Sequence, residues 1–190
     1  MKRFLILLAT LVWGASAQAA SVLGDDGLHK ADWMRNTFKD LREDLHEANA
    51  EGLRLMVLIE QRGCIYCTQM HDEVYPIPEV DALIRENYFV VQINMFGDTE
   101  VTDFDGEVLS EKEMVMKWGL MFTPTILFFP EDVPDGLSAT EARVGYVPGA
   151  LGASMFYNML TWVIEHGYDS GENFQAYHAR IFNAGGGLGR

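Results

Sequence analysis

The sequence is poor in cysteine, in positive charge and in long apolar segments. Its 190 residues include two cysteines and six prolines, and 14 Lys and Arg stand against 28 Asp and Glu, which gives a formal net charge of −14 at pH 7. A surface of this sign repels phosphate backbones and anionic lipid, so we expect no nucleic-acid binding and no binding to membrane surfaces. No segment approaches the roughly 20 apolar residues that a membrane-spanning helix needs, so we also expect no membrane insertion.

The first 19 residues have the pattern of a secretory signal peptide. Lys2 and Arg3 precede an apolar run at 4–13, and small residues follow up to Ala17-Gln18-Ala19. We expect cleavage after Ala19 and an exported, periplasmic protein. This segment holds two of the basic residues and no acidic one, so the remaining 171 residues have a formal net charge of −16.

The remaining chain has the length of one domain with a substantial core, which we place at 20–183 and expect to be monomeric. Residues 20–30 show no periodicity and are predicted to be a loose leader. The tail at 184–190, AGGGLGR, has no apolar face to bury and is predicted to be disordered.

Apolar periodicity and turn residues predict an alternation of helices and strands. Helices are expected at 34–48, 68–75, from Pro78 onward, at 110–118, at 156–164 and at 172–181; strands are expected at 53–59, 88–96, 123–129 and 142–147. Between them, the acidic segment 97–109 contains Asp105-Gly106, which favours a tight hairpin turn.

This order predicts an α/β fold with a central mixed sheet flanked by helices. The last two strands follow each other closely and should pair antiparallel. The fold would carry a helical extension at its N-terminus, a small acidic hairpin insert and an extended helical region at its C-terminus.

The two cysteines, Cys64 and Cys67, stand in the stretch EQRGCIYCTQM, and three roles are open to them. A structural disulfide between them closes a very small loop and therefore constrains the unfolded chain little. A zinc site needs about four ligands, and a second CxxC or a nearby HxxxH is missing from the sequence. A redox couple fits best, because the pair directly follows a buried strand and stands at the first turn of a predicted helix.

In a redox couple the two cysteines would have unequal roles. The N-terminus of a helix favours a thiolate at Cys64 through its partial positive charge and its unpaired N–H groups. Cys64 would attack the disulfide of a partner protein, and Cys67 would then resolve the mixed disulfide.

The CIYC motif after a buried strand, together with Thr123-Pro124-Thr125 at the start of a later strand, resembles the thioredoxin superfamily. The resemblance covers about residues 38–166. It implies a thioredoxin fold in which the Thr123–Pro124 bond is cis and lies beside the cysteines, where the adjacent backbone pairs with the substrate chain. It also implies that Thr123, Pro124, Ile65 and Tyr66 contact the substrate.

Within the superfamily, the chain looks most like the exported thioredoxins of bacterial sulfur-oxidation systems, of the SoxW or SoxS type. The resemblance rests on the GCIYC site, the DFDGEVLSEKE insert, the WGLMFTPTILFF block and the ARVGYVPGA strand with the long helix after it. It implies a periplasmic reductase that keeps a sulfur-carrier component active. A membrane thiol transporter would supply its electrons, because the sequence holds no P-loop or dinucleotide fingerprint and thus no cofactor beyond the redox-active disulfide.

The chain departs from ordinary thioredoxins around the cysteines. Thioredoxins have WCGPC and a buried aspartate six residues before the first cysteine, a position that Leu58 occupies here. Glu60 is a candidate proton acceptor, although its place in the pattern is that of a polar residue at the end of a strand. His71 is predicted to be an exposed residue on a helix flank, and Arg62 a solvated loop residue.

Other functions remain open beside the reductase. A thiol oxidase or a disulfide isomerase could use the same fold, and Tyr66 before the second cysteine resembles the isomerases. A copper-binding redox chaperone could use both cysteines with His71 or with methionines at 114, 116 and 121, but we predict that those methionines pack in the core. The acids of the insert, Asp98, Asp103, Asp105 and Glu107, do not have the spacing of a calcium loop, and we predict that the insert is a solvated hairpin.

Overall fold

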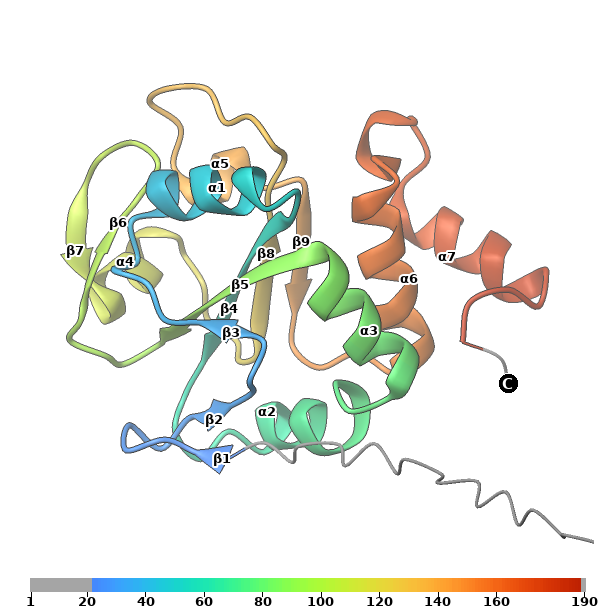
Figure 1. Cartoon of the computed structure of the whole chain (residues 1–190), viewed down its shortest axis with the longest axis horizontal. Helices are drawn as coiled ribbons and strands as arrows, with labels where there is room; N and C mark the ends of the chain where they lie inside the picture. Colours follow the sequence, from blue (N-terminus) through green and yellow to red (C-terminus); the bar gives the residue numbers. More distant parts are fainter. Residues whose placement is uncertain (1–21, 189–190) are drawn as a thin grey trace, which may run out of the picture.

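The computed structural model describes residues 22–188, and its centre is a five-stranded mixed sheet with the order β3-β5-β4-β8-β9 (Figure 1). The strands are β3 (Met34–Arg35), β4 (Arg54–Glu60), β5 (Tyr88–Asn94), β8 (Thr125–Phe128) and β9 (Gly145–Pro148). β3, β5 and β4 run parallel, and β8 pairs antiparallel with both β4 and β9. The mixed sheet and the antiparallel pairing of its last two strands are as predicted.

Helices cover both faces of this sheet (Figure 1). One face packs against α1 (Leu41–Ala50), α4 (Glu111–Lys117) and α5 (Ala139–Ala142), and the other against α3 (Pro78–Asn87), α6 (Ala153–Ile164) and α7 (Phe174–Asn183). β4 supplies alternate side chains to both cores: Leu55, Val57 and Ile59 face the first, Met56 and Leu58 the second. The continuous apolar run of this strand therefore reflects burial on both sides.

Local sequence signals determine several helix ends. The Asp40 side chain accepts hydrogen bonds from two backbone N–H groups at the start of α1, and Pro78 is the first residue of α3. Ser110 and Glu113 form the predicted capping box of α4. Gly119, with φ of +67°, follows that helix in the left-handed region, as expected for a residue that ends a helix.

The N-terminal region differs from its prediction. The helix expected from residue 34 begins only at Leu41, and Phe38 is 94% exposed. Met34 and Arg35 instead form β3 at the sheet edge, where they pair with β5. The helix does not extend back to them because Lys39, with φ of +59°, lies outside the right-handed helical region and Asp40 is the N-cap. The predicted loose leader is also wrong: β1 (Val22–Leu23) and β2 (His29–Lys30) form an antiparallel hairpin, and Leu28 is buried.

The acidic insert forms the expected hairpin from β6 (Glu100–Thr102) and β7 (Val108–Ser110). Its Asp103 is fully buried, in contrast to the predicted solvated segment. The carboxylate accepts hydrogen bonds from Trp118 Nε1 at 2.8 Å and from the Ala139 N–H at 2.8 Å, and it pairs with Lys117 Nζ at 2.9 Å. The insert is thereby joined to α4 and to the start of α5.

The C-terminal part follows α6 through a short 3-10 turn at Gly167–Asp169 into α7. In the segment predicted as a disordered tail, Leu188 packs half-buried against the second core, and residues 189–190 lie outside the described part. The predicted signal peptide also lies outside it. Within residues 22–188, none of the helices has the length and apolar character needed to cross a bilayer.

Candidate redox site

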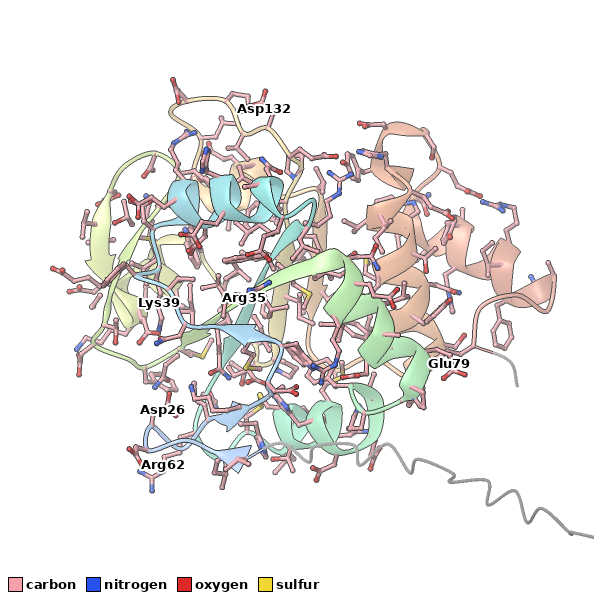
Figure 2. The ribbon with its side chains drawn as sticks, viewed as in Figure 1. Asp26, Arg35, Lys39, Arg62, Glu79 and Asp132 are labelled. Carbon is pink, nitrogen blue, oxygen red and sulfur yellow. A yellow bond between two sulfur atoms is a disulfide. The ribbon has the colours of Figure 1, made fainter. Side chains whose placement is uncertain are left out.

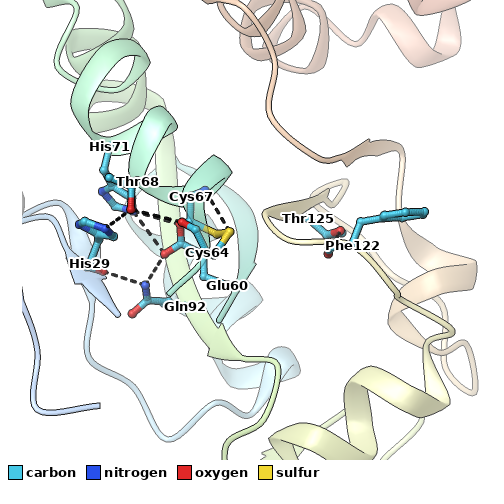
Figure 3. The surroundings of a disulfide bond; sticks show 9 residues. All are labelled: His29, Glu60, Cys64, Cys67, Thr68, His71, Gln92, Phe122 and Thr125. Atoms are coloured by element: carbon cyan, nitrogen blue, oxygen red, sulfur yellow. Dashed lines mark hydrogen bonds and ion pairs between the residues drawn. A yellow bond between two sulfur atoms is a disulfide. The ribbon is translucent and has the colours of Figure 1, made fainter. Parts of the chain in front are cut away.

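The two cysteines lie at the turn from the end of β4 into α2 (Ile65–Gln69), and their sulfur atoms form a disulfide bond (Figure 3). Gly63, with φ of +72°, makes the turn before them in a conformation that residues with a Cβ adopt only with strain. Cys64 is the N-cap of the helix, and the Cys67 N–H donates a hydrogen bond to Cys64 Sγ at 3.0 Å. Cys64 is 7% exposed and Cys67 only 1%, so the first sulfur is the more accessible of the two.

The Thr123–Pro124 peptide bond is cis, as the resemblance implied. The register between β4 and β8 pairs Ile59 with Thr125, so the start of β8 lies next to the end of β4, from which the cysteine turn emerges. Thr123 and Tyr66 line one shared groove of about 350 Å³. Two of the four predicted substrate-contacting residues, Tyr66 and Thr123, therefore share a groove, and Ile65 and Pro124 are their neighbours along the chain but do not line it.

Apolar side chains are exposed around this groove. Ile65, Tyr66, Met121 and Phe122 are between 56% and 77% exposed. Besides Tyr66 and Thr123, the groove is lined by Gln69, Phe122 and the residues of 149–152. We call the four exposed residues Ile65, Tyr66, Met121 and Phe122 the apolar rim. The prediction that Met121 packs in the core was wrong, because the chain after α4 turns outward to reach β8.

Glu60 and His71 form a buried pair beneath the disulfide turn (Figure 3). Both side chains are 1% exposed, and His71 Nε2 lies 3.1 Å and 3.3 Å from the two carboxyl oxygens of Glu60. Gln92 of β5 donates a second hydrogen bond to Glu60, at 2.6 Å. Glu60 is thus not a polar strand end facing solvent, and the prediction of an exposed His71 was wrong.

His71 reaches Glu60 because the helix after Cys67 changes its winding. The helix predicted at 68–75 is continuous, but residues Met70–Val74 form a π-helical turn, η1. Such turns often occur at functional sites. Tyr75 then lies edge-on against the His71 ring, with 4.9 Å between ring centres, and its pKa is raised well above 10 by burial and by the nearby Glu60 charge.

The N-terminal hairpin completes this polar cluster. His29 stacks on His71 with 4.8 Å between ring centres, and its Nε2 lies 2.9 Å from Thr68 Oγ1. Thr68 in turn donates a hydrogen bond to the carbonyl oxygen of Cys64 at 3.2 Å. Burial and the neighbouring His71 lower the pKa of His29 below its usual 6.5.

Sequence reasoning did not find three members of this cluster, His29, Thr68 and Gln92. Gln92 left a signal, because it is the polar residue within the apolar run YFVVQI of a buried strand. A buried amide needs hydrogen-bond partners, and Glu60, the His29 carbonyl and Lys30 supply them. His29 left none, since nothing in the sequence brings residue 29 next to residues 68 and 71.

The other candidate sites have structural explanations. Met114 is fully buried, as predicted. Met116 is 70% exposed, so the prediction that it packs in the core was wrong; it lies on the solvent face of the same helix. Lys117 pairs with Asp103, Asp105 and Glu107, so that an ammonium group stands where a calcium ion would have to bind. Within the described residues 22–188, no group of three or more His, Cys, Asp or Glu side chains is arranged to hold a metal ion.

Arg62 is exposed in the turn before the cysteines, as predicted. Its aliphatic stem packs against Gly27, where an added Cβ would lie 2.9 Å from Arg62 Cδ and Cγ. Figure 2 shows Arg62 pointing outward at the end of the molecule that carries the β1–β2 hairpin. The turn before Cys64 is therefore in contact with the hairpin.

A disulfide between cysteines three residues apart, at the turn from a central strand into a helix and next to a cis-proline, defines the class of protein. The sulfur atoms can be reduced and reoxidised in exchange with another disulfide. The protein is a thiol–disulfide oxidoreductase.

The chain belongs to the thioredoxin-like domain family, which matches residues 41–161. Among solved structures, it is similar to a thioredoxin-fold protein from Helicobacter pylori, with 16% sequence identity, a TM-score of 0.57, and coverage of 70% of this chain and 86% of that chain. It is also similar to a thioredoxin from Thermus thermophilus, with 23% identity, a TM-score of 0.53, and coverage of 70% and 90%. None of the curated proteins matches the chain. These similarities confirm the predicted thioredoxin fold.

Proposed function

We propose that the protein is a periplasmic reductase of protein disulfides. The observation that carries the proposal is the inequality of the two cysteines: Cys64, the N-cap residue, is the more exposed at 7%, whereas Cys67 is 1% exposed. An accessible thiol can attack a substrate disulfide, and a buried one can resolve the mixed disulfide without reacting first. The proposed periplasmic location rests on the predicted signal peptide, which would be removed by cleavage after Ala19.

The substrate would bind along the groove beside the disulfide. Thr123 and Pro124 stand directly before β8, where an extended chain can approach their backbone. The apolar rim offers exposed side chains from α2 and from the segment before β8. An extended peptide gains affinity from backbone hydrogen bonds and specificity from side-chain pockets. A flexible segment around a protein disulfide therefore fits this groove better than a small molecule.

The partners follow from this proposal and from the sequence resemblance. The substrate would be a disulfide of a sulfur-carrier component of a sulfur-oxidation system, and a membrane thiol transporter would supply the electrons to a monomeric reductase. A Cys67→Ser variant should accumulate a mixed disulfide with the physiological partner in the periplasm of its native cell. The matched Cys64→Ser variant should accumulate none.

The direction of electron flow can be measured as the reduction potential of the Cys64–Cys67 couple. A value near about −270 mV is that of a reductase, and one near about −120 mV is that of an oxidase. Equilibration with glutathione or dithiothreitol, followed by thiol alkylation and intact-mass analysis, gives the value. We expect the reductase range, and a potential in the oxidase range would overturn the proposed direction.

A further inference from the structure

The β1–β2 hairpin lies outside the residues that the thioredoxin-like family matches, yet it is built onto the redox site. Leu28 anchors it, with only 2% of the residue exposed. The His29 carbonyl accepts a hydrogen bond from Gln92 Nε2 at 2.8 Å, and Lys30 Nζ donates one to Gln92 Oε1 at 2.5 Å. The hairpin thereby fixes the amide that itself donates to Glu60.

His29 links two parts of the site that are otherwise separate (Figure 3). Through Thr68 it is connected to the carbonyl of Cys64, and through its stacking on His71 it is connected to Glu60. Glu60 is the last residue of β4, the strand from which the cysteine turn emerges. Figure 3 shows its side chain beside the turn that carries Cys64 and Cys67, and both Glu60 and Cys67 are 1% exposed.

We propose that His29 is a positioning residue of the redox site, which acts through His71 and whose charge controls how well the buried Glu60 accepts the proton of Cys67. The inference rests on the proposed role of Cys67 as the resolving thiol. When Cys67 attacks the mixed disulfide, its S–H proton passes to the Glu60 carboxylate and a bond forms between Cys67 Sγ and Cys64 Sγ. The bond between Cys64 Sγ and the substrate sulfur breaks, and that sulfur leaves with the electron pair as a thiolate.

The physical reason is electrostatic. The imidazole of His29 is half-buried and can exchange protons with solvent, whereas His71 and Glu60 are sealed in the interior. A positive charge on His29 stabilises the Glu60 carboxylate and makes it a weaker base. Resolution should therefore slow as the pH falls and His29 becomes charged.

The charges around His29 come from four directions. They are those of Asp26 and Lys30 in its own hairpin, Glu60 in β4, His71 and Asp72 in η1, and Tyr75 at the end of η1. Asp26 and Lys30 form an ion pair at 2.7 Å and largely cancel. The charge of the hairpin that faces the buried pair is thus that of the His29 imidazole.

The test uses the full mature protein, reduced and mixed with an excess of a disulfide-linked peptide dimer. The first step, formation of the mixed disulfide, is measured in the Cys67→Ser background, and the second step is the release of the bound peptide half. For the second step, we compare between variants the rate at pH 7.5 divided by the rate at pH 5.0. We expect His29→Gln to lower this ratio by about three- to ten-fold, because its uncharged side chain removes the pH-dependent weakening of Glu60.

Two further variants sharpen the test. Glu60→Gln should slow the second step by about 100-fold at pH 7.5, since it removes the proton acceptor, and adding His29→Gln to it should leave the rate ratio of Glu60→Gln unchanged. His46→Gln, on the exposed face of α1, is the matched control and should keep the wild-type ratio.

The outcomes separate this inference from the proposed function. If His29→Gln slows the second step by the same factor at pH 7.5 and at pH 5.0, the role of His29 is structural and the inference is overturned. The same holds if His29→Gln changes the rate ratio in the Glu60→Gln background, because the effect would not pass through Glu60. If instead the wild-type protein and the Cys67→Ser variant do not react with the peptide disulfide at all, the proposed reductase function fails.

Discussion

The buried pair of Glu60 and His71 should stabilise the fold as long as both partners are present. Replacing His71 with Leu keeps the volume roughly constant but leaves a fully buried carboxyl group without its imidazole. The loss of one partner of such a pair costs about 3 kcal/mol, because the remaining group stays desolvated. We therefore expect His71→Leu to lower the free energy of unfolding of the oxidised protein by about this amount.

The assay is urea unfolding followed by tryptophan fluorescence. With a slope of about 2 kcal/mol per molar urea, the midpoint of His71→Leu should fall by about 1.5 M. The double variant Glu60→Gln/His71→Leu should recover at least about 1 kcal/mol of the loss, because a neutral amide costs less to bury than a carboxylate. His46→Leu, at an exposed position, is the control and should stay within about 0.5 kcal/mol.

Two results would refute this reasoning. A loss below about 1 kcal/mol for His71→Leu would mean that the pair contributes little to stability. A double variant less stable than His71→Leu alone would mean that Glu60 is held by Gln92 and the surrounding backbone and not by the imidazole.

Three further predictions concern a buried acid, the insert and the apolar rim. Burial raises the pKa of Asp44 to about 7, so the folded protein keeps a proton there that the unfolded chain loses above about pH 4. The free energy of unfolding should therefore fall by on the order of 2–4 kcal/mol between pH 4 and 7. Urea unfolding at each pH should show that Asp44→Asn flattens this dependence. Asp103→Ala removes the acceptor that joins the insert to two helices and should lower the free energy of unfolding by about 2–4 kcal/mol in the same assay. The control Asp98→Ala, at a side chain that is 82% exposed, should change it by no more than about 0.5 kcal/mol. Equal losses of stability in both variants would contradict the role of Asp103 in joining the insert to the helices. Phe122→Ala should raise KM for a peptide disulfide about five-fold with little change in kcat. Phe96→Ala, at a residue that is 69% exposed against 56% for Phe122 and lies outside the groove, should leave both constants unchanged; a matching rise in KM in both variants would remove the rim from substrate binding.

The sheet and its covering helices could be predicted because their signals are local. The apolar run of β4, the proline at the start of α3 and the capping box of α4 each act within a few residues, and each is found where it was expected. The disulfide turn belongs to the same group, because strand, turn and helix follow one another along the chain.

The parts that were missed depend on contacts between distant residues. The hairpin around Leu28 has no periodicity of its own, and it is ordered by packing against residues at 62, 68 and 92. His71 was expected at the surface because an ordinary helix would place it on the flank. The π turn changes its direction, and only the folded structure brings it to Glu60.

The proposed reductase mechanism depends most directly on the unequal roles of Cys64 and Cys67. The deciding measurement is the intact mass of the reduced Cys67→Ser and Cys64→Ser variants after brief reaction with the same disulfide-linked peptide dimer. We predict that Cys67→Ser gains the mass of one peptide half, linked to Cys64, while Cys64→Ser remains unmodified over the same time. Adducts of equal yield on both variants, or an adduct confined to Cys67, would contradict the assignment of Cys64 as the attacking thiol.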